Sequence, residues 1–502
     1  MAVSPARPGL NGRRRGQPHG LARGAVGSAR VVAFGASNVA PAGAVVGGLV
    51  LIVSYAGFAS PLVVLVAFAA ALCCASSIGE FARRLPSAGS LYTYNSRGLG
   101  VVGGFLTGWM MIFAYALYVP AGISLTSAYA SQLVADTLHV TVSDRVLFVV
   151  ILAAAVLVAY VGIGTSSWVD LVLVAGETAV IAALAITILV KTGPAHYSAA
   201  VLVPASSPHG QLSDLTNAMI YGTTAFAGFE AAAALGEEAR NTRRSIPAST
   251  IGIVAVTGLF YLLVIAAEMF GVGRDGAARL AQQRSPLAFL TSQYWSPSAL
   301  WTIDLVVVLT GLGFVIAALN AAIRIMFAMG REQVLPTSLA RVSGRHTPVV
   351  AIGCVAGLAL ALGLPLTYAY GGGRAFGYLA GAGGLSVVLI YLAVNVATIR
   401  AFRTEFRPDF RPGRHLVVPA VAVALFLFPL WGIIHPRTRS LMDLLPFAAL
   451  GWLCAGAVAA GLLRIRRPAS LETLGRVFMP APDNPQAPRA CPPPPDRRTA
   501  AQ

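Results

Sequence analysis

Two glutamates of this chain lie inside long apolar stretches, where acidic side chains are rare. Glu177 falls in the apolar stretch 168–190, and Glu230 falls in the stretch 215–236. An ionisable side chain at the centre of a bilayer costs about 3 kcal/mol, so it is a candidate for function. We therefore predict that Glu230 and Glu177 serve proton or ion coupling, with Glu230 the stronger candidate. The structural alternative is a carboxylate that caps a helix or bonds a neighbouring helix.

The first apolar stretch contains a helix-breaking segment. Residues 34–48 read FGASNVAPAGAVVGG. Pro41 removes a backbone donor, and Gly43 tolerates non-helical dihedral angles. Freed backbone groups at membrane depth must be satisfied by protein, water or ligand. The predicted substrate contacts in this segment are Ala40, Pro41, Ala42 and Gly43.

A second helix-breaking segment occurs in the stretch that carries Glu230. Residues 221–230 read YGTTAFAGFE, with glycines on both sides of two hydroxyls and an aromatic ring. Interrupted spans at matching positions in two halves of a chain indicate the midplane site of a transporter. The alternative is a simple kink with close helix packing, which the spacing Gly43-x-x-x-Gly47 would also suit. The predicted substrate contacts here are Thr224, Ala225, Phe226, Ala227 and Gly228.

The composition of the chain indicates that membrane-spanning helices hold these two segments in place. The chain is 56% hydrophobic and 11% charged, whereas a soluble domain carries about 25% charged residues. A spanning helix needs about 20 mostly apolar residues, and twelve such stretches are predicted. They are 31–54, 60–82, 101–125, 146–163, 168–190, 215–236, 249–271, 298–323, 348–366, 376–398, 416–434 and 442–463. The predicted fold is an all-α polytopic membrane protein.

Basic residues predict the orientation. With the N-terminus inside, 28 of the 36 Lys and Arg residues fall on the inner side and 8 on the outer side. This asymmetry predicts that both termini are cytoplasmic and that the protein lies in the cell membrane. The arginines are distributed between apolar stretches, which argues against a nucleic-acid partner.

The predicted domains are a disordered basic N-terminal tail (1–30), a transporter domain (31–465) and a Pro-rich disordered cytoplasmic C-terminal tail (466–502). The five cysteines show no metal-binding or redox spacing, so no cofactor or metal is expected. No HExxH or GxSxG motif occurs, which argues against a membrane enzyme.

Four motifs occur in a family-specific order. They are E80FARRLPSAGSLYTY94, G104FLTGW109, F226AGFE230 with its following loop E237EARNTRRSIP247, and R324IMFAMGR331. The chain therefore resembles the amino acid–polyamine–organocation family of permeases over about residues 31–465. The resemblance implies a five-plus-five inverted repeat (LeuT-like) with two extra C-terminal helices.

The resemblance also implies a function, which is secondary active transport of amino acids by proton-coupled symport or exchange through alternating access. A half-helix N-terminus suits a carboxylate and a half-helix C-terminus suits an ammonium, so an amino acid could bind at the breaks. Neutral or weakly polar amino acids are predicted because Glu230 is the one clear acid at the breaks. A polyamine or amine carrier, and a nutrient sensor on a transporter scaffold, remain as alternatives.

The chain departs from the family pattern at three positions. Pro41-Ala42-Gly43 stands where relatives have a Gly-small-Gly break. Thr224 stands where some members place a large aromatic gate, which makes Phe226 the nearer candidate for a lid. Glu177 stands where some proton-coupled members carry a lysine, so the charge at the coupling position is reversed.

Overall fold

The computed structural model describes residues 27–85, 90–161, 167–235, 239, 241–283, 285–344, 347–434 and 441–466. All regular elements within these ranges are helical, as composition predicted. Most of the two predicted tails, and the loop residues Glu237, Glu238 and Arg240, lie outside the described residues.

Nine helices of 17 residues or more form the frame. They are α4 (Ser60–Ala82), α6 (Val101–Leu138), α7 (Asp144–Val161), α8 (Ser167–Thr192), α10 (Thr242–Ala281), α12 (Leu300–Arg331), α15 (Gly372–Arg403), α16 (Val418–Ile434) and α17 (Leu441–Arg466). The shorter helices are α1 (Ser28–Val39), α2 (Pro41–Ala44), α3 (Val50–Ala56), α5 (Ser90–Leu99), α9 (Leu212–Ala225), α11 (Pro286–Tyr294), α13 (Val349–Leu358) and α14 (Leu364–Tyr370).

Ten helical segments of the described residues are long and apolar enough to cross a membrane. The difference from the twelve predicted spans arises at two places. The first two predicted spans fall within one apolar segment, Gly35–Ala82, of 48 residues, although one crossing needs only about 20. The predicted sixth span, 215–236, is interrupted after Ala225 and falls below the length of a continuous spanning helix.

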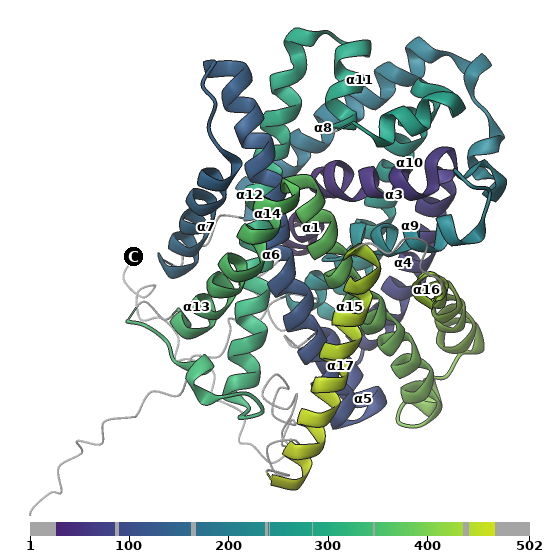
Figure 1. The fold of residues 1–502 in the computed structure, drawn as a ribbon. Helices are drawn as coiled ribbons and strands as arrows, with labels where there is room; N and C mark the ends of the chain where they lie inside the picture. The colour runs from purple at the N-terminus through teal and green to yellow at the C-terminus, as the bar shows by residue number, and fades with distance from the viewer. Residues whose placement is uncertain are drawn as a thin grey trace, which may run out of the picture.

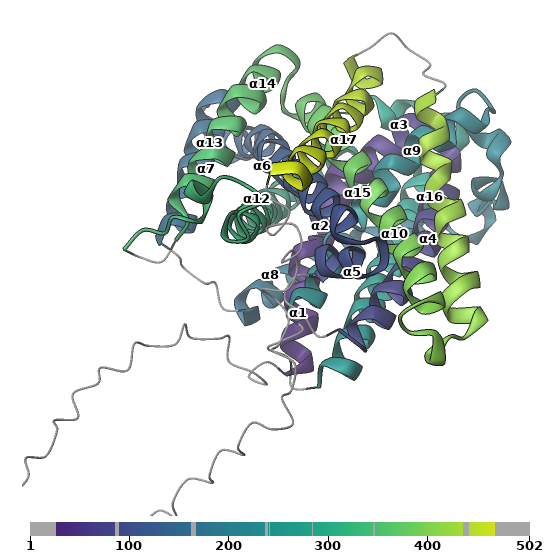
Figure 2. The same cartoon turned by 90° about the horizontal axis from the view of Figure 1, so that it is seen from below.

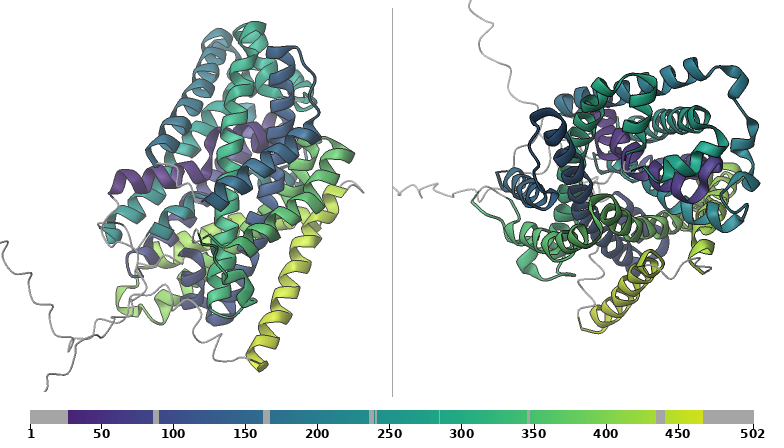
Figure 3. Two further views of the ribbon diagram at one scale, coloured as in Figure 1. Left: turned by 90° about the vertical axis from the view of Figure 1, so that its left-hand side faces the viewer. Right: turned by 45° about the horizontal axis from the view of Figure 1, so that its top comes forward.

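The centre of the bundle is built on α6, which packs along α12 on one side and α15 on another. Figures 1 and 2 show α1, α9 and α10 grouped around this centre, with α7 and α13 at one edge and α16 at the opposite edge. Both views of Figure 3 place the last helix, α17, at the margin of the bundle. The broken segments therefore lie among the buried helices.

A pair of tryptophans attaches α17 to α6. The indole N–H of Trp109 donates to the carbonyl of Trp452 (2.8 Å), and the indole N–H of Trp452 donates to the carbonyl of Trp109 (2.9 Å). Their rings stack with centroids 4.5 Å apart. Both indole donors are thus satisfied in an apolar setting, which is the usual requirement for buried tryptophan.

Candidate substrate and coupling site

The first break occurs at Ala40. Helix α1 ends at Val39, and Ala40 adopts left-handed backbone angles (φ 47°, ψ 65°) before α2 begins at Pro41. Proline suits the first position of a helix, because its missing N–H would have no helical partner there. The left-handed conformation costs an alanine about 1 kcal/mol. Ala42 and Gly43 lie inside α2, so the break sits at the start of the predicted contact segment.

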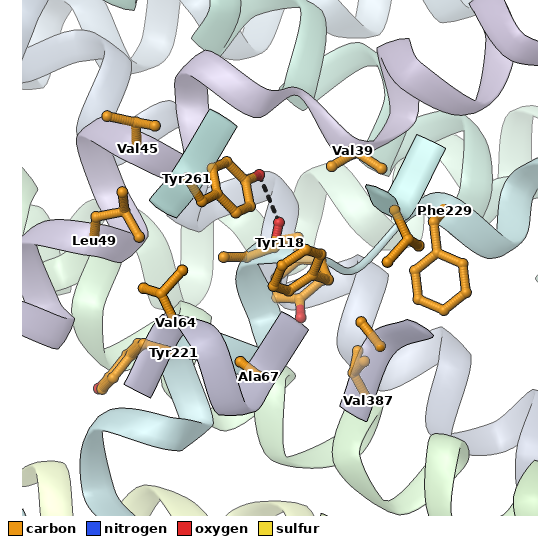
Figure 4. Packing of buried hydrophobic residues seen from close by; sticks show 14 of the residues in the cluster. Val39, Val45, Leu49, Val64, Ala67, Tyr118, Tyr221, Phe229, Tyr261 and Val387 are labelled. Carbon is orange, nitrogen blue, oxygen red and sulfur yellow. Dashed lines mark hydrogen bonds between the residues drawn. The ribbon is translucent and has the colours of Figure 1, made fainter. Parts of the chain in front are cut away.

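The second break follows α9. Phe226, Ala227 and Gly228 form a turn, and a 3₁₀ segment continues over Phe229–Leu235. Gly228 has a φ of 108°, which L side chains rarely adopt. The carbonyl of Ala225 at the end of α9 accepts a hydrogen bond from the Tyr261 hydroxyl (2.8 Å), drawn as a dashed line in Figure 4. The interrupted backbone is therefore partly satisfied by a neighbouring helix, as the membrane interior requires.

The two breaks pack against each other, backbone to backbone. A Cβ atom at Gly228 would overlap the Asn38 carbonyl oxygen and would lie 3.0 Å from the backbone nitrogen of Val39. Figure 4 labels Val39 on the first segment and Phe229 on the second. Only glycine permits this approach, because any side chain at position 228 would meet fixed backbone atoms.

Glu230 lies directly beyond the second break and is 4% exposed. Its carboxylate accepts hydrogen bonds from the Tyr115 hydroxyl (2.7 Å), the Tyr391 hydroxyl (2.8 Å) and the backbone N–H of Gly228 (3.0 Å). Tyr115 belongs to α6 and Tyr391 to α15. One carboxylate therefore joins the broken segment to both central helices.

Glu177 belongs to α8, lies beside the first break and is 6% exposed. Its carboxylate accepts a hydrogen bond from the Thr310 hydroxyl of α12 (2.5 Å). The methyl group of Thr310 would lie 2.9 Å from a Cβ atom added at Gly43. Thr310 is thus the link between Glu177 and the α2 half of the first break.

The predicted contact residues of the second break lie between helices. Phe226 is 1% exposed, and its ring stacks on Phe68 (6.1 Å between centroids) and contacts Tyr261 edge-on (5.2 Å). The Thr224 hydroxyl donates to the carbonyl of Ile220 (2.8 Å). The structure brings the end of α1, at Asn38 and Val39, together with Gly228, and it links Glu177 through Thr310 to Gly43 of α2.

Two buried hydroxyls near this region have no hydrogen-bond partner among the described residues. They are the Tyr118 hydroxyl on α6 and the Thr223 hydroxyl on α9, and each residue is 2% exposed. An unsatisfied buried polar group costs about 1–3 kcal/mol. Such hydroxyls are natural partners for a polar ligand. Neither residue is among the contacts predicted from the sequence.

Sequence reasoning also missed Tyr391, one of the three donors to Glu230, and Thr310, the donor to Glu177. Each is an ordinary residue within a long apolar stretch, and each meets its glutamate only through helix packing. The only signal in the sequence was a hydroxyl side chain within a predicted span. Many residues in other spans share this feature, so it does not single out either residue.

Comparisons with known proteins match the sequence of this chain to one family. The family model for amino acid permeases matches residues 30–435. The branched-chain amino acid permease BcaP of Lactococcus lactis is 24% identical over 403 residues, covering 75% of this chain and 83% of that protein. BcaP of Bacillus subtilis is 26% identical over 422 residues, covering 80% of this chain and 85% of that protein. The low-affinity putrescine importer PlaP of Escherichia coli is 26% identical over 284 residues, covering 54% and 59%.

The family predicted from four sequence motifs is confirmed by a model that covers most of the chain. The relatives are named as permeases and an importer, and ten helical segments of the residues that the structure describes are long and apolar enough to cross a membrane. The chain belongs to the amino acid permease family of polytopic membrane transporters.

Proposed function

We propose that this protein is a secondary active transporter that carries amino acids with uncharged side chains by alternating access. The observation that supports this proposal is the contact between two broken helices, Gly228 against the backbone of Asn38 and Val39 at the end of α1, in the buried centre of the bundle. Broken helices of this kind expose backbone groups that an amino acid needs for both of its charges.

The start of α2 supplies a site for the substrate carboxylate. The first intrahelical bond runs from the Ala44 N–H to the Ala40 carbonyl (3.1 Å). The N–H groups of Ala42 and Gly43 come earlier in the first turn, where a helix offers its N–H groups no carbonyl four residues back. A helix N-terminus also carries about half a positive charge. The carboxylate would therefore bind at Ala42 and Gly43, and Pro41 would hold the turn.

The end of α1 and the second break supply a site for the substrate ammonium. The last carbonyls of a helix lack intrahelical partners and carry partial negative charge. The predicted contacts are the backbone of Thr224–Gly228, the end of α1 and the unpartnered hydroxyls of Tyr118 and Thr223. Phe226, which packs against Phe68 and Tyr261, would hold this segment in position.

A polyamine is the less favoured substrate, because Glu230 already accepts three hydrogen bonds. A second ammonium would have to displace one of those donors. The two branched-chain permeases cover more of this chain than the putrescine importer does. These facts favour amino acids with apolar side chains.

Uptake into proteoliposomes tests the substrate class. Labelled leucine should accumulate under an imposed pH gradient, and unlabelled valine and isoleucine should compete. Uptake of putrescine without uptake of any amino acid would overturn the proposal.

Thr223→Val should raise the KM for leucine about tenfold, by loss of one hydrogen bond of roughly 1.4 kcal/mol. Thr137→Val, which removes an exposed hydroxyl at the end of α6, should leave the KM unchanged.

We further propose that protons drive transport and that Glu177 carries the proton, while Glu230 anchors the second break. A carrier must gain and lose its proton as the protein changes conformation. Glu177 has one hydroxyl donor to rearrange, whereas Glu230 has three donors from three segments.

The proposed topology is twelve crossings arranged as two five-helix repeats plus α16 and α17, with both termini cytoplasmic. The split of basic residues supports this orientation. A reporter fused after Gly344 should read as cytoplasmic, and a reporter within 193–211 should read as external. The opposite result at either position would contradict the twelve-span arrangement.

A further inference from the structure

A charged pocket lies at the boundary between membrane and water, away from the two breaks. It has a volume of about 290 Å³ and lies between the end of α4 and the segment that joins α15 to α16. Helix α4 ends at Ala82, and the membrane-spanning segment that contains α16 begins at Gly413. The pocket is therefore at the level expected for lipid headgroups. Figures 1 and 2 show α16 beside α4 at the edge of the bundle.

The floor of the pocket is buried and its side chains are hydrogen-bonded. Glu80 is 7% exposed and His415 is 1% exposed. The His415 ring stacks on Phe402 with centroids 3.8 Å apart, and its Nδ1 accepts a hydrogen bond from the backbone N–H of Arg411 (2.9 Å). The ring proton is then on Nε2, which donates to the Glu80 carboxylate (3.2 Å).

Arginines form the walls. Arg84 lies 3.2 Å from Glu80 and 3.2 Å from Asp409, while Arg83 and Arg414 each lie 3.8 Å from Glu80. Arg411 also lines the pocket, and no acid among the described residues pairs with its guanidinium. With His415 neutral, four arginines and two acids give the pocket a net charge of +2. Glu80 is thus fully compensated, and positive charge is in excess.

We propose that this pocket binds the phosphate group of an anionic phospholipid. Guanidinium groups bind phosphate through paired hydrogen bonds, and basic pockets between helices at the membrane boundary hold acidic headgroups. The surface beyond the pocket suits the acyl chains, since Val417, Val421 and Leu427 on or beside α16 are exposed apolar residues. A lipid would therefore bridge α4 and α16 at the rim of the bundle.

Native mass spectrometry of the full-length protein tests this site. After exchange into detergent with phosphatidylglycerol, the wild type should retain one tightly bound molecule, and phosphatidylcholine should not replace it. Arg411→Gln together with Arg414→Gln should weaken phosphatidylglycerol binding about 30-fold, at about tenfold or less for each arginine. Both side chains are exposed, so these substitutions should leave folding intact.

A matched control separates a site from general charge attraction. Arg400 and Arg403 are exposed at the end of α15 and do not line the pocket. Arg400→Gln together with Arg403→Gln removes the same charge and should leave binding unchanged. Equal weakening in both double variants would overturn the proposal, as would unchanged binding in the pocket variant.

A gain of binding provides the second test. Asp409→Asn removes an acid at the rim that is 61% exposed and that pairs with Arg84. It should tighten phosphatidylglycerol binding about fivefold, an effect that misfolding cannot mimic. Weaker binding in this variant would count against the proposal. Inorganic phosphate should not displace the lipid at millimolar concentration. Displacement by phosphate alone would overturn the lipid assignment in favour of a soluble anion.

Discussion

The two breaks are built by different means, although they touch. At the first break an alanine takes the left-handed conformation and a proline starts the next helix. At the second break a glycine takes a positive φ against the backbone of the first, and Glu230 ties the segment to α6 and α15. The acid nearest the first break, Glu177, has a single hydroxyl donor and sits on a different helix.

This difference indicates a division of labour. A carboxylate held by three donors from separate segments stabilises one arrangement of those segments and is costly to disturb. A carboxylate held by one hydroxyl can lose that bond, rotate or change charge at lower cost. We therefore expect substitutions at the second break to affect folding and transport together, and substitutions at the first break to affect transport alone.

The largest effect is expected from Gly228→Ala. The added methyl group would meet the Asn38 carbonyl, and alanine disfavours a φ of 108°. We expect a loss of about 3 kcal/mol in the free energy of unfolding and no measurable uptake. Thermal unfolding in detergent and leucine uptake measure both. Gly252→Ala on α10, where a Cβ would meet nothing within 4 Å, is the control. A stable and active Gly228→Ala protein would show that the breaks are not in contact during transport.

Loss of the anchor at Glu230 is expected to follow. Glu230→Gln replaces an acceptor of three bonds by an amide whose NH₂ group opposes a donor, and Tyr391→Phe removes one donor. Each should lower the free energy of unfolding by about 2 kcal/mol, with reduced transport in both directions. Tyr370→Phe on α14, an exposed position, should change neither. If Glu230→Gln keeps its stability and loses only the response to pH, Glu230 is the proton carrier and the comparison is reversed.

A selective effect is expected from Glu177→Gln. The Thr310 hydroxyl can still donate to the amide oxygen, so the free energy of unfolding should change by less than about 1 kcal/mol. Accumulation driven by a pH gradient should disappear, while exchange of labelled for unlabelled leucine should continue because exchange moves no net proton. Thr310→Val should retain accumulation at a lower rate. Normal gradient-driven accumulation by Glu177→Gln would exclude this residue as the carrier.

The smallest effect is expected from Gly43→Ala. The new Cβ would lie 2.9 Å from the Thr310 methyl group, and a side chain can shift where a backbone cannot. Gly43 is inside α2, where alanine is favoured over glycine by about 0.5–1 kcal/mol. We expect unchanged stability and a roughly threefold higher KM for leucine, about 0.7 kcal/mol of binding. A loss of stability as large as that of Gly228→Ala would show that both breaks are equally constrained.

The sequence by itself determined the class of protein and the location of both interruptions along the chain. These features depend on nearby residues alone. A span follows from the hydrophobicity of its own stretch, and a break follows from the backbone preferences of its own residues, here Pro41 and the glycines. Family membership followed from four motifs in order, and the match over residues 30–435 confirmed it.

Only the tertiary structure decided which residues meet. Gly228 lies against Asn38, 190 positions earlier in the printed sequence, and Tyr391 meets Glu230 across 161 residues. The pocket around Glu80 likewise joins α4 to a segment more than 300 residues later. No local pattern encodes such pairs, since a hydroxyl in one apolar helix resembles a hydroxyl in any other until packing gives it a partner. The different surroundings of Glu230 and Glu177, and hence their proposed roles, come from that packing.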